Sequence, residues 1–167
     1  MSAKEIINYS VWAIIYITLQ ILLMQHIVLF GYAFCFIYIA LILLLPIETD
    51  TLTAMLIALG AGLLVDVFYN TLGIHAAASV LVAYARPIWL RMIVDIKEAD
   101  RIEIDLNGLG FARFSVLTFP LILLHHTALF FIEMNSFILL PYTLIKIAAS
   151  SVFTMILLLL SQSFRKS

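Results

Sequence analysis

Charged residues and cysteine are scarce in this sequence. Asp, Glu, Lys and Arg make up 11% of the 167 residues, and the formal net charge is -1. This balance argues against a nucleic-acid partner, because nucleic-acid binding calls for a basic surface. The single cysteine, Cys35, can form neither an internal disulfide nor a thiolate metal site alone, so we expect it to serve in packing. The sequence also lacks internal repeats, low-complexity segments and a glycine-rich phosphate-binding loop.

Apolar residues dominate instead. They make up 65% of the chain, and the mean hydropathy of +1.16 lies far outside the range of a soluble globular domain. A helix needs about 20 apolar residues to cross a hydrocarbon layer of about 30 Å. The length of the chain therefore accommodates five or six crossings within one transmembrane domain, residues 1–167.

Six apolar runs are separated by polar residues or turn formers. They cover residues 6–23, 27–45, 53–69, 74–90, 114–132 and 137–161. Gln25, His26 and Gly31 interrupt one long apolar stretch and thereby separate the first two runs, and the second run is short enough to be partly re-entrant. The pattern predicts an all-α polytopic membrane protein of about six transmembrane helices.

The positions of the cations predict the orientation. With the N-terminus in the cytoplasm, eight of the nine Lys and Arg residues fall on the cytoplasmic side: Lys4, Arg86, Arg91, Lys97, Arg101, Arg113, Arg165 and Lys166. The ninth, Lys146, lies within the last apolar run. By the positive-inside rule, we expect both termini in the cytoplasm.

One hydrophilic stretch, at about 91–112, should form a cytoplasmic loop. Its charges alternate with isoleucines and leucines, which suits an amphipathic element on the membrane surface or a docking site for a cytosolic partner. A solvated linker is the other interpretation. About 20 residues leave no room for a catalytic domain on that side.

The most informative residue is Asp66, an acid inside an apolar run. Counting back from it in steps of four gives Gly62, Ala58 and Ala54, so one helix face consists of small residues and ends in a carboxylate. Small residues let helices approach closely, and we expect this face to contact another helix. A charge at the bilayer centre costs on the order of 3 kcal/mol, so Asp66 should face protein or water.

Two residues are candidate partners of Asp66. His75 begins the next helix, after a tight turn that ends at Gly73, and needs no special geometry, whereas Lys146 in the last helix needs a long reach. Either pairing would form a polar clamp that fixes the helix register. Two further polar stripes predict interior faces: Trp12, Tyr16 and Gln20 in the first helix, and Tyr142, Lys146, Ser150 and Thr154 in the last. We expect His125 and His126 to be packing residues with one hydrogen bond each.

The sequence favours a protein without catalytic activity. An intramembrane aspartyl protease needs two facing acids, and Glu133 lies at the very edge of its span. Ser79 follows His75 on the same helix without a recognisable nucleophile motif. We expect no catalytic residue, no cofactor and no metal ion.

A family resemblance rests on residues 60–84. GLLVD at residues 62–66, followed by LGIH at residues 72–75 and by Tyr84, resembles the signature of MreD, the bacterial rod shape-determining membrane protein. The resemblance implies a non-enzymatic scaffold of the peptidoglycan elongation machinery in the inner membrane. The implied partners are MreC, a single-span periplasmic coiled-coil protein, together with MreB, the polymerase RodA and its transpeptidase. Contact with membrane lipids is also implied.

The MreD family is similar in fold to the substrate-binding membrane subunits of energy-coupling-factor vitamin transporters. The alternative function is therefore capture of a small molecule, with Asp66, His75 and the polar stripe of the last helix lining an outward cavity. The candidate interface and structural residues are Ala54, Ala58, Gly62, Asp66, Gly73, His75 and Lys146. As a scaffold, the chain should lose its partner but still fold when Gly62 is replaced by Leu.

Overall fold

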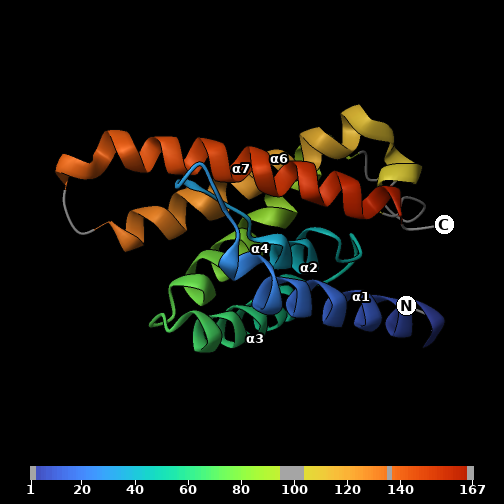
Figure 1. Ribbon diagram of the computed structural model, residues 1–167. Coiled ribbons are helices and arrows are strands. Elements are labelled where there is room, and N and C mark those ends of the chain that lie inside the picture. The colour runs from blue at the N-terminus through green and yellow to red at the C-terminus, as the bar shows by residue number, and fades with distance from the viewer. Residues whose placement is uncertain (1–2, 95–103, 135–136, 165–167) are drawn as a thin grey trace.

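The computed structural model describes residues 3–94, 104–134 and 137–164. This part of the chain is almost entirely helical (Figure 1). Within it, five helices are long and apolar enough to cross a membrane: α1 (Ala3–Leu22), α3 (Thr51–Tyr69), α4 (Ile74–Ile93), α6 (Leu106–Glu133) and α7 (Leu140–Ser163). The chain is thus all-α, with five helices suited to span a membrane, as its composition predicts.

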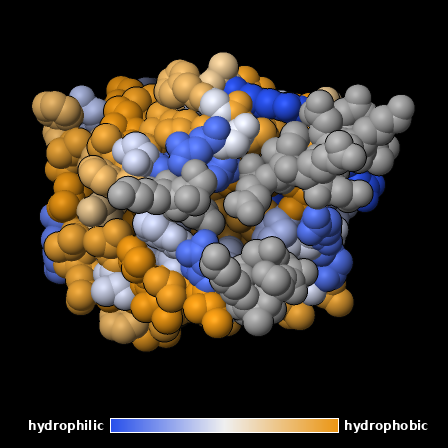
Figure 2. Space-filling model, turned by 90° about the vertical axis from the view of Figure 1, so that its right-hand side faces the viewer, coloured by the Kyte–Doolittle hydropathy of each residue, from blue (hydrophilic) through white to orange (hydrophobic). Residues whose placement is uncertain are grey.

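The bundle has two distinct ends. The start of α1 and the end of α7 share the end on the right of Figure 1, which we call the proximal end. The turns that follow α3 and α6 lie at the opposite, distal end. Figure 2 looks onto the proximal end and shows hydrophilic residues gathered across its middle, with hydrophobic residues around much of the edge. An apolar flank with a polar end is the surface expected of a chain embedded in a bilayer.

The helix expected over residues 27–45 does not form, and that prediction is wrong. The chain instead forms the short elements η1 (Met24–His26), β1 (Val28–Leu29), β2 (Ala33–Phe34), η2 (Ile37–Ile39) and α2 (Ala40–Leu43). β1 and β2 pair antiparallel. Phe30 and Gly31 between them have φ of 53° and 79°, a left-handed backbone that reverses the chain and ends any helix.

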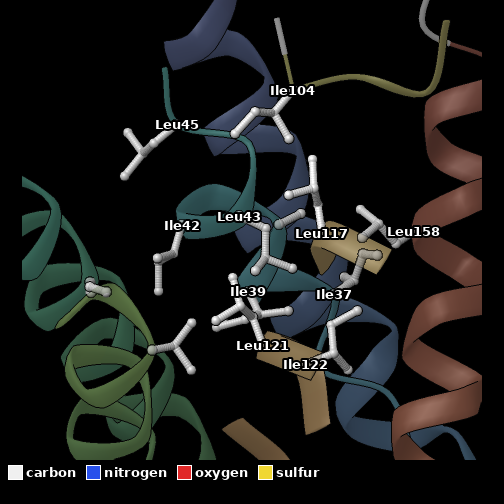
Figure 3. Packing of buried hydrophobic residues seen from close by; sticks show 14 of the residues in the cluster. Ile37, Ile39, Ile42, Leu43, Leu45, Ile104, Leu117, Leu121, Ile122 and Leu158 are labelled. Carbon is white, nitrogen blue, oxygen red and sulfur yellow. The ribbon is translucent and has the colours of Figure 1, made fainter. Parts of the chain in front are cut away.

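Residues 32–46, which we call the crossing segment, run through the middle of the bundle. They begin beside the distal half of α7 and end at the proximal connection to α3 (Figure 1). Every residue from Cys35 to Leu43 is at most 3% exposed. Figure 3 shows the isoleucines and leucines of this segment packed against α6 and α7, with these residues labelled: Ile37, Ile39, Ile42, Leu43, Leu45, Leu117, Leu121, Ile122 and Leu158. Between α1 and α3 the chain is therefore an irregular interior segment that other helices surround.

Two local features position the α3–α4 hairpin. Asp50 begins α3 as its N-cap, because its carboxylate accepts the backbone N–H of Thr53 at 2.9 Å. Asn70 ends α3 with φ of 54°, and Gly73 precedes α4 with φ of 82°. Both residues adopt the left-handed conformation that Gly and Asn tolerate best. The predicted tight turn between the third and fourth apolar runs is confirmed.

The hydrophilic loop predicted at about 91–112 lies partly outside the described residues, which exclude 95–103. Its first residues complete α4, and its last residues belong to α6. Gly110 interrupts α6 with a non-helical backbone of φ 72° and ψ 163°. A short first stretch of α6 is thereby separated from the long apolar part of the helix.

A buried polar network as the candidate functional site

The crossing segment poses a hydrogen-bonding problem. Irregular backbone at membrane depth is tolerated only where protein groups or trapped water satisfy its N–H and C=O groups. One face of α7 supplies two such groups: Phe34 N donates to Ser150 Oγ (2.9 Å) and Phe36 N donates to Thr154 Oγ1 (3.1 Å). On the same helix, the exposed Tyr142 Oη donates to the carbonyl oxygen of Gly31, just before the segment (3.1 Å). Ser150 and Thr154 are fully buried, so the predicted interior stripe of the last helix is confirmed for these two residues.

α1 holds the same segment from the other side. The amide of Gln20, which is fully buried, donates to Cys35 O at 3.1 Å and accepts the Tyr38 N–H at 3.3 Å. The Tyr9 hydroxyl donates to Leu41 O at 2.5 Å. The stripe predicted on the first helix therefore faces the interior at Gln20, where one side chain satisfies two backbone groups.

Arg86 closes the proximal end of the crossing segment. Its guanidinium donates to the carbonyl oxygens of Leu45 and Pro46, and the residue is 1% exposed. The sequence places Arg86 among the cytoplasmic cations that set the orientation, but the structure buries it in α4 near the proximal end. A guanidinium carries five donors in a fixed fork, which suits the capture of successive carbonyl groups.

Tyr38 lies at the centre of the network. Its hydroxyl is 2.8 Å from His125 Nε2, 3.0 Å from Ser79 Oγ and 3.3 Å from His75 Nδ1. A hydroxyl donates one hydrogen and accepts at most two, so these three neighbours use its whole capacity. Tyr38 thereby ties the crossing segment to both α4 and α6.

His126 is linked to the crossing segment through Thr154. Its Nδ1 is 2.8 Å from Ile122 O, and a carbonyl only accepts, so Nδ1 carries the hydrogen of the neutral ring. Nε2, 3.1 Å from Thr154 Oγ1, must then accept the threonine hydrogen. This leaves the Thr154 oxygen free to accept the Phe36 N–H. The sequence suggested a packing residue with one hydrogen bond, and it carried no signal for this relay because the linked residues are far apart in the chain.

Asp66 meets His75 through the backbone and not through the imidazole. Its carboxylate accepts the His75 N–H at 3.1 Å, the Ala76 N–H at 3.0 Å and the Thr71 hydroxyl. The residue is 3% exposed. Backbone N–H groups at a helix start lack partners within the helix, and a negative charge there is favourable. Asp66 therefore caps α4 from the neighbouring helix, and Gly73 supplies the turn that brings the cap into place.

The small-residue face of α3 does contact another helix, and that helix is α4 of the same chain. A Cβ added to Gly62 would lie 2.4 Å from Ala76 Cα, a distance that real Cβ atoms do not show. Ala54 and Ala58 are buried in one cluster with Val82 and Ala83 of α4. The face is therefore closed to a partner, which reverses the expectation that Gly62→Leu would leave the chain folded.

Lys146 pairs with Glu133 and not with Asp66. Lys146 Nζ is 3.0 Å from Glu133 Oε2, across the turn between α6 and α7. The ammonium also lies 4.5 Å from the ring centre of Phe130 and 5.0 Å from that of Phe34. Lys146 thus links α6, α7 and β2 at the distal end.

We expect the Lys146–Glu133 pair to contribute little stability, because the Glu133 side chain is 52% exposed. A double-mutant cycle of Lys146→Met and Glu133→Gln should give a coupling of about 1 kcal/mol or less. The corresponding cycle of Lys146→Met and Asp66→Asn should give none. Unfolding of the purified variants measures both values, and a larger coupling to Asp66 than to Glu133 would contradict the observed pairing.

The polar residues at membrane depth are thus engaged mainly with the chain's own backbone. Within the described residues, no group of three or more His, Cys, Asp or Glu side chains is arranged to hold a metal ion. Comparison of the whole chain with protein-family models, curated proteins and solved structures found no match.

Proposed function

We propose that this protein is a non-enzymatic scaffold of the peptidoglycan elongation machinery, related to MreD. It sits in the bacterial inner membrane with its proximal end and both termini in the cytoplasm. There it binds MreC and works with MreB, RodA and its transpeptidase. One observation carries the proposal: the residues of the family signature, 62–66 and 72–75, build a locked helical hairpin.

The lock has three parts, each of which uses a residue type that the signature supplies. Gly62 allows α4 to approach, Asp66 caps it, and Gly73 makes the turn. A scaffold has to present helices at fixed spacing, and a hairpin locked in this way does so. In a ligand site, by contrast, the Asp66 carboxylate would have to remain free.

A partner helix then has to meet α3 on its other face. Four leucines lie there with the alternating four- and three-residue spacing of a coiled-coil seam, and all are exposed: Leu52 (67%), Leu56 (59%), Leu59 (41%) and Leu63 (48%). Such spacing lets a second helix pack side by side at a shallow angle. We assign this leucine seam to the transmembrane helix of MreC.

The alternative is a substrate-binding membrane subunit of an energy-coupling-factor vitamin transporter. It requires Asp66, His75 and the polar stripe of α7 from Tyr142 to Thr154 to line an outward cavity. Tyr142 is 46% exposed, but Asp66, His75, Ser150 and Thr154 are at most 3% exposed, and each has a hydrogen-bonding partner within the chain. The observation weighs against ligand capture and favours the scaffold.

The test is affinity purification of the tagged chain from its native membrane, with mass spectrometry of bound proteins and small molecules. Wild type is compared with a variant in which Leu56 and Leu63 are Ala. The matched control replaces Leu144 and Val152 on α7, which are exposed to similar extents, by Ala. MreC and wall-synthesis proteins should accompany wild type and the control and be depleted from the seam variant. Recovery of an ATPase pair with a stoichiometric vitamin-like ligand would overturn the proposal.

A further inference from the structure

Three of the four histidines face one short stretch of the crossing segment. The ring centre of Phe36 lies 5.2 Å from that of His75, 6.0 Å from His125 and 5.3 Å from His126. These histidines are at most 3% exposed, whereas the fourth, His26, is exposed on η1. The imidazoles are therefore concentrated where the buried backbone is neither helix nor sheet.

The hold of α6 on this stretch depends on uncharged imidazole. His126 Nε2 accepts the Thr154 hydrogen, and Thr154 in turn accepts the Phe36 N–H. A proton on Nε2 would turn this nitrogen into a donor, and the threonine hydrogen would lose the acceptor that it has in the neutral network. The other ring nitrogen of His125, Nδ1, is buried and has no hydrogen-bond partner, so a proton added there would meet no acceptor.

The surroundings offer little compensation for a positive charge. The titratable groups around the imidazoles are Cys35 and Tyr38 of the crossing segment, Asp66 and Tyr69 of α3, and Glu133 and Lys146 at the distal end. α1 contributes the neutral amide of Gln20. Both carboxylate oxygens of Asp66 already accept the donors at the start of α4. His125 and His126 are also close neighbours, with ring centres 5.4 Å apart, so two charges there would repel.

We propose that His75, His125 and His126 form an acid-sensitive clamp on the crossing segment. In neutral solution the clamp holds residues 34–38 against α4, α6 and α7. In acid, the imidazoles take up protons, water enters to solvate them, and this stretch of the segment opens. The inference rests on the hydrogen-bonding geometry alone and is independent of the proposed function.

Cys35 provides a built-in reporter, because it lies within the clamped stretch, is 1% exposed and is the only thiol in the chain. The experiment measures the rate at which a methanethiosulfonate reagent labels the purified protein in lipid nanodiscs, at about pH 7.5 and about pH 5. Each rate is divided by that of the denatured chain at the same pH, which cancels the change in thiolate fraction. The normalised rate should rise about tenfold or more in acid, since each proton taken up on opening shifts the equilibrium tenfold per pH unit below about 6.5.

Two variants assign the response to the clamp. His125→Gln combined with His126→Gln removes two of the three titrating groups and should lower the acid-to-neutral ratio well below that of wild type, whereas His26→Gln should keep the wild-type ratio. If the double variant is already open at neutral pH, the single variant His126→Gln serves as the test of the clamp. Its glutamine oxygen can still accept the Thr154 hydrogen, but the side chain does not titrate. This variant should label slowly at neutral pH, with a reduced ratio. A wild-type ratio of one, or an unchanged ratio in these variants, would overturn the proposal.

Discussion

Gly62→Leu should abolish the folded state of the purified chain. Even a single added carbon would lie 2.4 Å from Ala76 Cα and 2.7 Å from Ala76 N, and these backbone atoms cannot turn aside as a side chain can. α3 and α4 would have to separate, which would also pull the Asp66 cap away from its N–H groups. Overpacking a core costs about 1–3 kcal/mol and occasionally more. Because the added side chain meets backbone atoms here, we expect a loss above that range.

Gly60→Leu is the matched control for this substitution. Gly60 lies two residues away on the same helix, and an added Cβ there meets nothing within 4 Å. The change should leave stability unaltered or raise it, because Gly is a poor helix former. Detergent-induced unfolding monitored by size-exclusion chromatography compares the two variants. Equal behaviour of the pair would contradict the close contact between α3 and α4.

Asp66→Ala should be the next most damaging change. It removes both carboxylate oxygens and leaves the N–H groups of His75 and Ala76 without their acceptor at a buried helix start. A buried polar group that loses its partner costs about 1–3 kcal/mol, so two such groups should lower the free energy of unfolding by on the order of 3 kcal/mol.

Asp66→Asn separates the hydrogen-bonding role of the Asp66 side chain from the role of its negative charge. The amide keeps one acceptor oxygen, and we expect roughly half of the loss seen with Ala. Thermal unfolding gives the order of stability of wild type and both variants. Each protein is first checked for a monodisperse elution profile. If Asn and Ala were equally damaging, charge and not hydrogen bonding to α4 would be the role of Asp66.

Local patterns in the sequence predict much of the α3–α4 hairpin. The four-residue spacing of Ala54, Ala58, Gly62 and Asp66 predicts a close helix contact, and Asn70 to Gly73 predicts the turn. The identity of the contacting helix could not be derived from that spacing. A small-residue face serves equally well within one chain and between two chains.

The wrong prediction for residues 27–45 has a different cause. An apolar run of membrane-spanning length indicates an apolar environment, and the interior of a bundle is as apolar as lipid. The groups that allow an irregular backbone there, such as Gln20, Ser150 and Thr154, lie on other helices. The sequence marks them as polar stripes but contains no local signal for what they hold.

The Lys146 prediction depended on depth along separate helices at 1.5 Å per residue. That estimate keeps Lys146 within long reach of Asp66, but it ignores Glu133 across the turn between α6 and α7. Glu133 is 13 positions away in sequence, and Lys146 Nζ lies 3.0 Å from its carboxylate. The nearer carboxylate pairs with the ammonium, and Asp66 is occupied by backbone donors.

The central claim is that polar side chains at membrane depth hold an irregular crossing segment, and the Phe36 amide tests it most directly. We would measure its hydrogen exchange by NMR in wild type, in Thr154→Val and in the control Thr118→Val. Thr118 is also buried, but its hydroxyl bonds Phe114 O of its own helix at 2.8 Å.

Exchange at Phe36 should be slow in wild type and in Thr118→Val, and about fivefold or more faster in Thr154→Val, as loss of a hydrogen bond of about 1 kcal/mol predicts. If residues 27–45 formed a helix, the Phe36 N–H would bond the carbonyl oxygen of Tyr32 in its own helix. Exchange at Phe36 would then be the same in all three proteins, and that result would contradict the account.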